Sequence, residues 1–600
     1  MITSLENPFL APRRRPIRGG DRHYDVKSTR AWITSLPMGD AMETGHEIAQ
    51  RLFLMNRTAM PPRERVQSLE TLLAPLGFVF EEMTEKTLKL PPPLSKRQLS
   101  QLRLADSLRI LLIQGYKAAL EQFHRDSGLR QVMNKHVRVL AAHRVLHFLG
   151  EMVLNAYRCY RTPPPYTWRE LHGIYNYTRE CGIHSKSVTD EQQEIPTRSD
   201  CTHLYKQTLL LATANPFRLQ RGEAELLTRE LRDWSTRCQL RTLDHRNRQR
   251  GLFLIDIGAD SPPRYRNESD DRLLTKGWVL DTAPLSRILT KLHENLQHRE
   301  PPSGRPDNAL SPDLLSRLML AWGIRPERCA RRESSTGEVN VACGVEAVVR
   351  NLCEDPALNR RAAPDDADVV LSPGELNRMG WDLRKKPSIQ SFDYSEFQGR
   401  ADFPRFAPNR SATAVNSKEF HSCTICNRSN LGIHLKQRDL ESWSISVGDL
   451  IGIEAAGGQH VEQHSQLGIV RWMQTDDRER ADFGVQLLDG TPEPVFFRLI
   501  ESDDESSVPF PGLLLFAEKK RPTLILPPTE GIEQRELSFS HKNIRLRITL
   551  GHAVESTNSF GQYLFGSQGA TEKRYPSGES TAKEETKHPE IDFKENWGLS

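Results

Sequence analysis

The sequence feature that most constrains the fold is a short polar turn, Asn427-Arg-Ser-Asn-Leu-Gly432, flanked by two strand-like runs. The run before it, residues 420–425, and the run after it, residues 433–435, are rich in β-forming side chains. Such a turn brings together an amide, a hydroxyl and exposed backbone N–H groups, and its glycine allows a positive φ or a close ligand approach. The stretch predicts a hairpin that can cradle an anion or a nucleotide, although the same residues also make ordinary turns.

Three further segments after this hairpin are short, β-prone and bounded by turn residues. They are residues 447–453, 467–472 and 482–488. Successive strands at this spacing favour a small antiparallel barrel, because closing the sheet removes exposed strand edges.

In this order the segments resemble a PilZ domain, the bacterial module that binds cyclic di-GMP. The matching motifs are Asn427-x-Ser429-x-x-Gly432, Val447-Gly-Asp449, Gly468-x-Val470-x-Trp472 and Phe483-Gly-Val-Gln486. The resemblance covers residues 399–502. It implies that Asn427, Ser429 and Gly432 contact the dinucleotide.

PilZ domains that bind the ligand also carry two arginines, spaced R-x-x-x-R, about twenty residues before the turn. Arginine suits this role because its planar fork bonds to phosphate oxygens or to a guanine edge. Here Arg400, Arg405 and Arg410 are spaced at intervals of five, and the position four before Arg405 is Ala401. Either Arg400 or Arg410 could supply the second fork. The alternative is a scaffold or adaptor protein whose degenerate barrel does not bind the ligand.

The region before the barrel is predicted to be helical over residues 41–245, preceded by a flexible arm at residues 1–40. The clearest helix spans residues 95–124, where apolar side chains recur at three- and four-residue steps. Paired helices with short connections indicate a tetratricopeptide-like or related array. Aromatic residues that either line a partner groove or pack between helices are Tyr157, Tyr160, Trp168, Tyr175 and Tyr177.

The remaining segments complete a multidomain α + β chain, in which a helical array precedes a PilZ-type antiparallel barrel with additional β-structure. Strand and helix signals mix in residues 246–360, which predicts an α/β connector or a degenerate second barrel. The other expected segments are a linker at 361–398, an accessory β-domain, sandwich-like, at 503–566, and a disordered tail at 567–600.

Composition and missing motifs narrow the function. The net charge is only +4 over 600 residues, which argues against an RNA-binding barrel. No signal peptide or membrane span is visible and the nine cysteines are scattered, so a cytoplasmic location is expected. Only Cys423-x-x-Cys426 has metal-like spacing, and without a second pair nearby both are expected to be strand residues, with no metal.

No common catalytic motif is present, and His434 fits an outward-facing strand residue better than a general base. The sequence therefore predicts a non-enzymatic cytoplasmic effector without a cofactor. Its barrel would bind cyclic di-GMP, and its helical region would engage a protein partner. No stable complex with a nucleic-acid polymer is expected.

Overall fold

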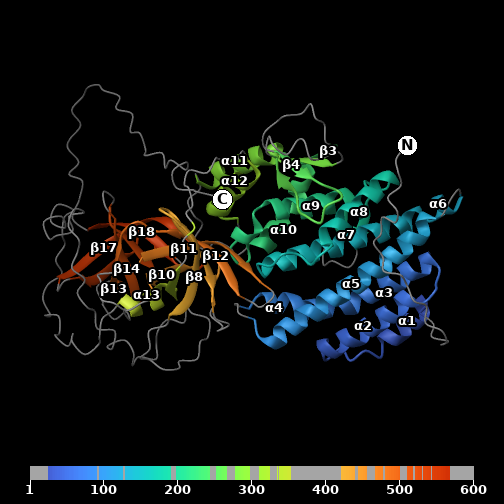
Figure 1. Cartoon of the computed structure of the whole chain (residues 1–600), viewed down its shortest axis with the longest axis horizontal. Helices are drawn as coiled ribbons and strands as arrows, with labels where there is room; N and C mark the ends of the chain where they lie inside the picture. Colours follow the sequence, from blue (N-terminus) through green and yellow to red (C-terminus); the bar gives the residue numbers. More distant parts are fainter. Residues whose placement is uncertain are drawn as a thin grey trace, which may run out of the picture. The chain divides into compact units, whose positions relative to one another are not determined.

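The computed structural model divides the chain into two compact units, residues 1–325 and 326–600. It describes residues 24–567 except for internal segments at 91–93, 126–128, 191–196, 243–251, 267–276, 298–309, 324–333, 335–336, 353–419, 439–443, 456–465, 477–479, 501–509, 518–520, 530 and 542–543. The predicted linker, nearly all of the predicted tail, and Arg400, Arg405 and Arg410 lie outside the described residues. In Figure 1 the first unit runs from blue to green and the second from yellow to red.

The first unit is built mainly from helices around a shared apolar core. Helix α5 packs against α2, α3 and α7. A capping box starts α5, since Ser95 Oγ accepts from the Gln98 backbone N–H at 3.3 Å and the Gln98 side chain accepts from the Ser95 N–H. The helices are α1 (Val26–Ile33), α2 (Ala41–Arg57), α3 (Pro62–Phe80), a π-helical turn (Glu81–Glu85), α4 (Lys86–Leu88), α5 (Lys96–His124), α6 (Leu129–Met133), α7 (Lys135–Arg158), α8 (Thr167–Glu180), α9 (Cys201–Thr213), α10 (Glu223–Trp234), α11 (Ala283–Gln297) and α12 (Pro312–Trp322).

The described residues of this unit also form two small sheets. Strands β1 (Val188–Asp190) and β2 (Thr197–Ser199) form a hairpin. An open four-stranded sheet has the order β3-β6-β4-β5. Its strands are β3 (Gln239–Thr242), β4 (Leu252–Ile255), β5 (Arg264–Tyr265) and β6 (Trp278–Asp281). The described strands of this sheet do not close into a barrel, so the degenerate barrel expected within residues 246–360 stays a prediction.

Several details of the helical unit decide between the sequence alternatives. The five tyrosine and tryptophan residues singled out above are all buried, so they pack between helices.

Helix α1 lies inside the predicted flexible arm, where the Asp25 carboxylate accepts from the Ser28 backbone N–H at 2.6 Å and caps the helix. The tetratricopeptide-like detail stays a prediction. The described helices include no candidate bilayer span, since each is too short or too polar.

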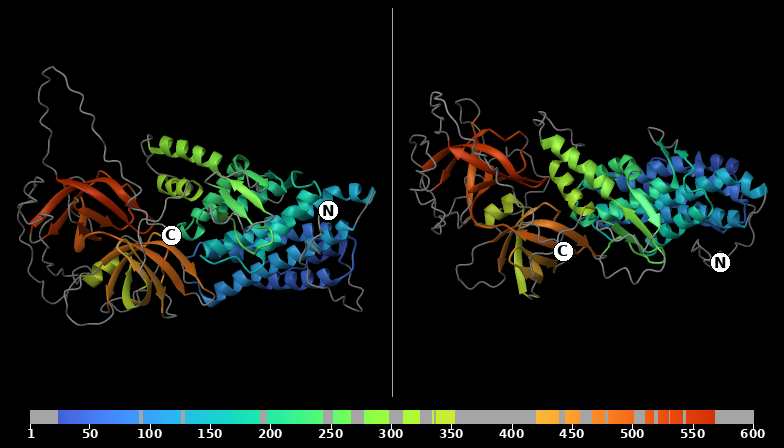
Figure 2. Two further views of the ribbon diagram at one scale, coloured as in Figure 1. Left: turned by 45° about the horizontal axis from the view of Figure 1, so that its top comes forward. Right: turned by 90° about the horizontal axis from the view of Figure 1, so that it is seen from above.

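The second unit contains two closed antiparallel barrels of six strands each (Figures 1 and 2). The first consists of β7 (Gly337–Cys343), β8 (His421–Ser429), β9 (Gly432–Gln437), β10 (Leu450–Ala455), β11 (Gln466–Thr475) and β12 (Ala481–Leu487). Helix α13 (Val345–Leu352) follows β7. The second consists of β13 (Thr491–Leu499), β14 (Phe510–Phe516), β15 (Thr523–Leu526), β16 (Glu536–His541), β17 (Ile544–Ser556) and β18 (Gly561–Ser567).

These barrels confirm the predicted fold class. Two of their strands, however, lie in other segments than the sequence predicted. Strand β7 lies in the predicted connector, yet it pairs with both β8 and β10 and so closes the first barrel. Strand β13 begins inside the predicted PilZ-like segment, yet it pairs with β14 and β16 of the second barrel. The accessory β-domain is thus a closed barrel and not a sandwich.

The two barrels also share one topology. When the strands of each barrel are numbered in chain order, both close in the ring 1-2-3-6-5-4. The second barrel therefore has the connectivity of the first, although it carries no copy of the N-x-S-x-x-G turn.

The carboxylate of Glu151, which is paired with Arg109 and His147, makes a pH-dependent contribution to the stability of the helical unit. Burial raises the pKa of Glu151, but His147 and Arg109 outweigh it and hold that pKa at about 2. The Arg109 Nε lies 3.1 Å from the carboxylate. A depressed pKa stabilises the folded state above pH 4.5, the ordinary value, and this stabilisation is lost as the pH falls toward 2.

We therefore expect Glu151→Gln to lower the free energy of unfolding at pH 7 by about 1 kcal/mol, a value discounted for solvent screening. The discount is needed because the Glu151 side chain is 33% exposed. Urea unfolding followed by helical circular dichroism from pH 7 to pH 3 measures the difference, which should shrink toward low pH. Glu82→Gln removes a surface pair with Lys86 and is the control. A difference that does not change with pH would contradict the assignment.

Candidate functional site

The polar turn lies in the hairpin formed by β8 and β9. Asn427 pairs with His434 and Ser429 pairs with Gly432, after a register irregularity between Ile425 and Asn427. His434 lies between buried Ile433 and Leu435 in strict alternation, so it faces outward, as expected from the sequence. Since directly opposed residues share a face, Asn427 lies on the outer surface of the barrel together with His434.

Side chains from four neighbouring strands meet on this outer face. Asn427 Nδ2 donates to Nδ1 of His434 at 3.1 Å, and Nε2 of His434 donates to the Asp482 carboxylate. The Trp472 ring lies 5.1 Å from the His434 ring. We call Asn427, His434, Asp482 and Trp472 the outer row.

Gly484 makes the outer row possible. It is the pairing partner of both His434 in β9 and Trp472 in β11. A Cβ atom at Gly484 would lie 1.8 Å from Nε1 of Trp472, so the indole ring occupies the space that any side chain would take. The missing side chain thus allows Trp472 to lie across β12 and reach His434.

Gly432 has a different role from the one that the turn suggested. Its φ is outside the left-handed region, so no positive φ requires glycine here. A Cβ atom would instead lie 2.8 Å from the Val485 carbonyl oxygen of β12. Glycine at this position therefore allows close approach of the neighbouring strand to the turn, while Ser429 Oγ donates to the Gly432 carbonyl at 3.3 Å.

The structure brings together the three predicted turn residues, Asn427, Ser429 and Gly432, in one hairpin. The three predicted arginines, Arg400, Arg405 and Arg410, lie outside the described residues. Sequence reasoning missed Trp472 and Asp482 as members of the site, and it assigned His434 a surface position without a role. Trp472 was visible in a strand motif, but only the pairing between strands places it beside the turn.

The two cysteines with metal-like spacing are strand residues. Both Cys423 and Cys426 lie in β8, and Cys423 is fully buried. Partial burial, together with the Asp482 carboxylate, raises the pKa of the Cys426 thiol, which disfavours the thiolate that would bind a metal. Within the described residues no group of three or more His, Cys, Asp or Glu side chains is placed to hold a metal ion.

A separate cavity of about 490 Å³ lies in the helical unit, lined by α7, α9, α10 and β2. Arg198 and Arg232 line it and are both exposed. The acidic residue in the lining, Glu151, is already paired with Arg109 and His147. The lining therefore carries an excess of positive charge, which fits an anionic group.

The outer row places hydrogen-bonding groups beside an aromatic ring. The Asn427 amide, and the Ser429 hydroxyl next to the outer row, are groups that can bond to polar atoms, and an indole ring can stack on a base. A chain of hydrogen bonds from Asn427 to Asp482 fixes the imidazole between them. Such an arrangement suits binding of a nucleotide.

Comparisons with known proteins show what the chain is similar to. Residues 27–245 match the family model described as "Cyclic-di-GMP receptor FimW, N-terminal domain". Residues 252–494 match the model described as "Cyclic-di-GMP receptor FimW, middle PilZ domain". The chain is also similar to the cyclic-di-GMP receptor FimW of Pseudomonas aeruginosa, with 23% identity over 560 residues that cover 90% of each protein.

Proposed function

Because the chain belongs to the PilZ-domain proteins, with a long helical N-terminal region, we propose that it is a non-enzymatic cytoplasmic effector that binds cyclic di-GMP. The observation that carries this proposal is the outer row, which gathers the Asn427 side of the N-x-S-x-x-G turn and the Trp472 ring on one face of the first barrel. The dinucleotide is a ligand here, and no cofactor is invoked.

Each group has a role that follows from its chemistry. Asn427 and Ser429 bond to the polar edge of a base or to phosphate oxygens, and Gly432 keeps the turn close to β12. Trp472 supplies a ring for base stacking, worth about 1–3 kcal/mol per base. Arg405, with Arg400 or Arg410, supplies the guanidinium forks that hold phosphates or a guanine edge.

Isothermal titration of the full chain with cyclic di-GMP tests this function. We expect saturable binding that weakens at least about tenfold in Arg405→Ala and in Asn427→Ala, since each removes one charge-assisted or buried polar contact. Arg400→Ala and Arg410→Ala identify the second fork. Thr424→Ala, at an exposed position of the same strand, is the matched control and should bind normally.

The alternative is a ligand-free scaffold, favoured by the five-residue spacing of the arginines. Absence of heat at tens of micromolar protein, with Arg405→Ala behaving identically, would support the scaffold and contradict the effector. Saturable binding that depends on Arg405 rules the scaffold out.

The helical unit is proposed to carry the output, by engaging a protein partner when the ligand is bound. Its support is the cationic cavity, whose exposed Arg198 and Arg232 fit an acidic segment. Hydrogen exchange of the full chain tests the coupling. Cyclic di-GMP should change the exchange of amides in α7, α9 and α10, whereas changes confined to residues 326–600 would contradict it.

A further inference from the structure

Strand β11 of the first barrel contributes residues to two features, an apolar cluster shared with the second barrel and the outer row. Its buried residues Leu467 and Ile469 belong to an apolar cluster that includes side chains of α13 and of the second barrel. The members from the second barrel are Phe496, Leu513, Leu515, Ile525 and Phe560. Farther along the same strand, Trp472 belongs to the outer row. One strand therefore connects the contact between the barrels with the candidate ligand site.

Arg471 lies where the two parts of β11 meet. The pairing with β12 runs from Val470–Val485 directly to Trp472–Gly484, so Arg471 is the extra residue of a β-bulge. Without the bulge, Trp472 would lie on the same face as Val470, which is buried inside the barrel. The bulge is thus what turns Trp472 onto the outer face.

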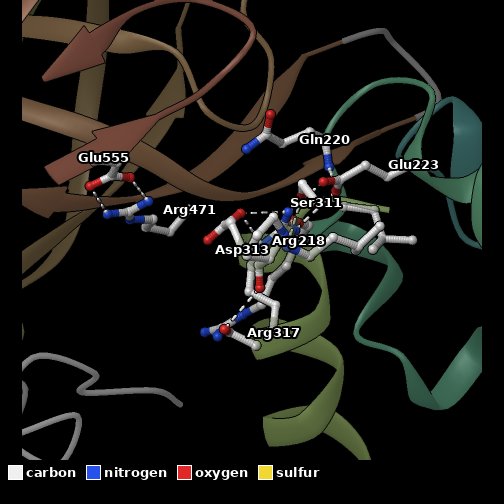
Figure 3. A network of polar contacts seen from close by, with 12 residues as sticks. Arg218, Gln220, Glu223, Ser311, Asp313, Arg317, Arg471 and Glu555 are labelled. Carbon is white, nitrogen blue, oxygen red and sulfur yellow. Dashed lines mark hydrogen bonds and ion pairs between the residues drawn. The ribbon is translucent and has the colours of Figure 1, made fainter. Parts of the chain in front are cut away.

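The side chain of Arg471 contacts residues of both barrels. Its Nε donates to Gln486 Oε1 at 2.7 Å, and Gln486 is the pairing partner of Gly432 in the turn. Its two terminal nitrogens donate to both oxygens of Glu555, one of them at 2.9 Å (Figure 3). This paired fork is the geometry in which an arginine is most strongly oriented.

Glu555 occupies a matching place in the second barrel. It lies in β17, the fifth strand of its barrel, as β11 is the fifth strand of the first. Glu555 also follows a register irregularity, between Ala553 and Glu555, in the pairing with β18. Equivalent strands of two barrels with the same topology are thus joined at an irregular position in each.

We propose that the second barrel sets the ligand affinity of the first by holding the Arg471 bulge, which makes Arg471 a positioning residue for Trp472. The part of this inference that concerns affinity rests on the proposed function. Gln486 binds Nε of the guanidinium and Glu555 binds its two terminal nitrogens, and this keeps the extra residue of β11 outside the ladder. When Glu555 loses its charge, the bulge is less firmly held and Trp472 samples positions away from His434.

Glu555→Gln in the full chain is the test, because Glu555 lies in the second barrel and is not part of the outer row. We expect cyclic di-GMP to bind about three- to tenfold more weakly, by titration calorimetry, with little change in the melting temperature. The charge swap Arg471→Glu with Glu555→Arg should recover part of the affinity. Arg438→Gln removes the Arg438–Glu338 pair of the first barrel and is the matched control.

A second readout needs no ligand. In protein labelled with 5-fluorotryptophan, the Trp472 resonance is assigned as the one missing from Trp472→Phe, and it should shift or broaden in Glu555→Gln but not in Arg438→Gln. An unchanged Trp472 resonance would overturn the proposal, as would normal ligand affinity in Glu555→Gln. If the unaltered protein does not bind the dinucleotide, the proposed function fails, and the fluorine spectrum still decides whether Glu555 positions Trp472.

Discussion

Replacing Gly484 by alanine should weaken cyclic di-GMP binding by at least about tenfold and lower the stability of the first barrel by about 1–3 kcal/mol. The added Cβ would lie 1.8 Å from Trp472 Nε1 and 2.5 Å from its Cδ1, so the indole ring must leave its place across β12. Titration calorimetry and thermal unfolding of the full chain measure the two effects. Because the backbone of Gly484 is outside the left-handed region, alanine causes no backbone strain that would confuse the result.

Gly337→Ala is the matched control for this substitution. Gly337 lies in β7 of the same barrel, and a Cβ atom there would meet Ile425 Cδ1 at 3.5 Å, an ordinary contact distance. We expect it to bind normally. Equal affinity of the two variants would show that Trp472 does not contribute to the site.

Lys117→Ala should lower the free energy of unfolding of the helical unit by about 3 kcal/mol. The Lys117 side chain is only 2% exposed, and its Nζ lies 2.8 Å from Oε1 of Glu170, itself mostly buried. Removing the lysine leaves the Glu170 carboxylate without this counter-charge and opens a cavity within the helix bundle. Urea unfolding monitored by helical circular dichroism provides the measurement.

Two comparisons separate charge from packing at Lys117. Lys86→Ala removes a lysine that forms a surface pair with Glu82, and it should change stability by less than about 0.5 kcal/mol. Lys117→Met combined with Glu170→Gln keeps most of the volume without the charges, and it should be more stable than Lys117→Ala. If all three variants unfold alike, the buried pair is not what holds α5 to α8.

The sequence was sufficient to place the turn and most strands of the first barrel, because those motifs depend on local composition. Strand β7 was assigned elsewhere, since residues 344–420 separate it from β8 and no local signal shows that it pairs there. The second barrel was predicted only as an accessory, sandwich-like β-domain, for a related reason. It shares the topology of the first without its turn motif, and topology is set by strand pairing, which periodicity alone does not reveal.

The outward position of Trp472 in the outer row could not be predicted from the sequence. Simple alternation places Trp472 on the same face as Gly468 and Val470, which points it into the barrel. The bulge at Arg471 reverses this, and a bulge has no reliable sequence signal because it depends on contacts with Gln486 and Glu555. His434 was placed correctly, but its link to Asp482 required knowing that β9 pairs with β12.

The helical unit shows a similar division between local and long-range information. Helix α5 was predicted almost to its ends, because its apolar spacing is a local signal. The network of polar contacts around Arg317 was not predicted. This side chain of α12 donates to Glu223 and Asp313 and to the Arg218 carbonyl (Figure 3), and it joins segments far apart in the sequence.

The closure of the first barrel by β7 decides how this protein can be divided for experiments. A fragment that begins at residue 399, where the motifs start, would lack β7 and leave the hydrogen-bonding edges of β8 and β10 uncovered. Uncovered edges recruit strands from other molecules, so such a fragment should aggregate or exchange strands between copies. A fragment that ends at residue 502 would likewise separate β13 from the strands that pair with it. Every strand of both barrels lies within residues 337–567, and the compact unit that holds them spans residues 326–600.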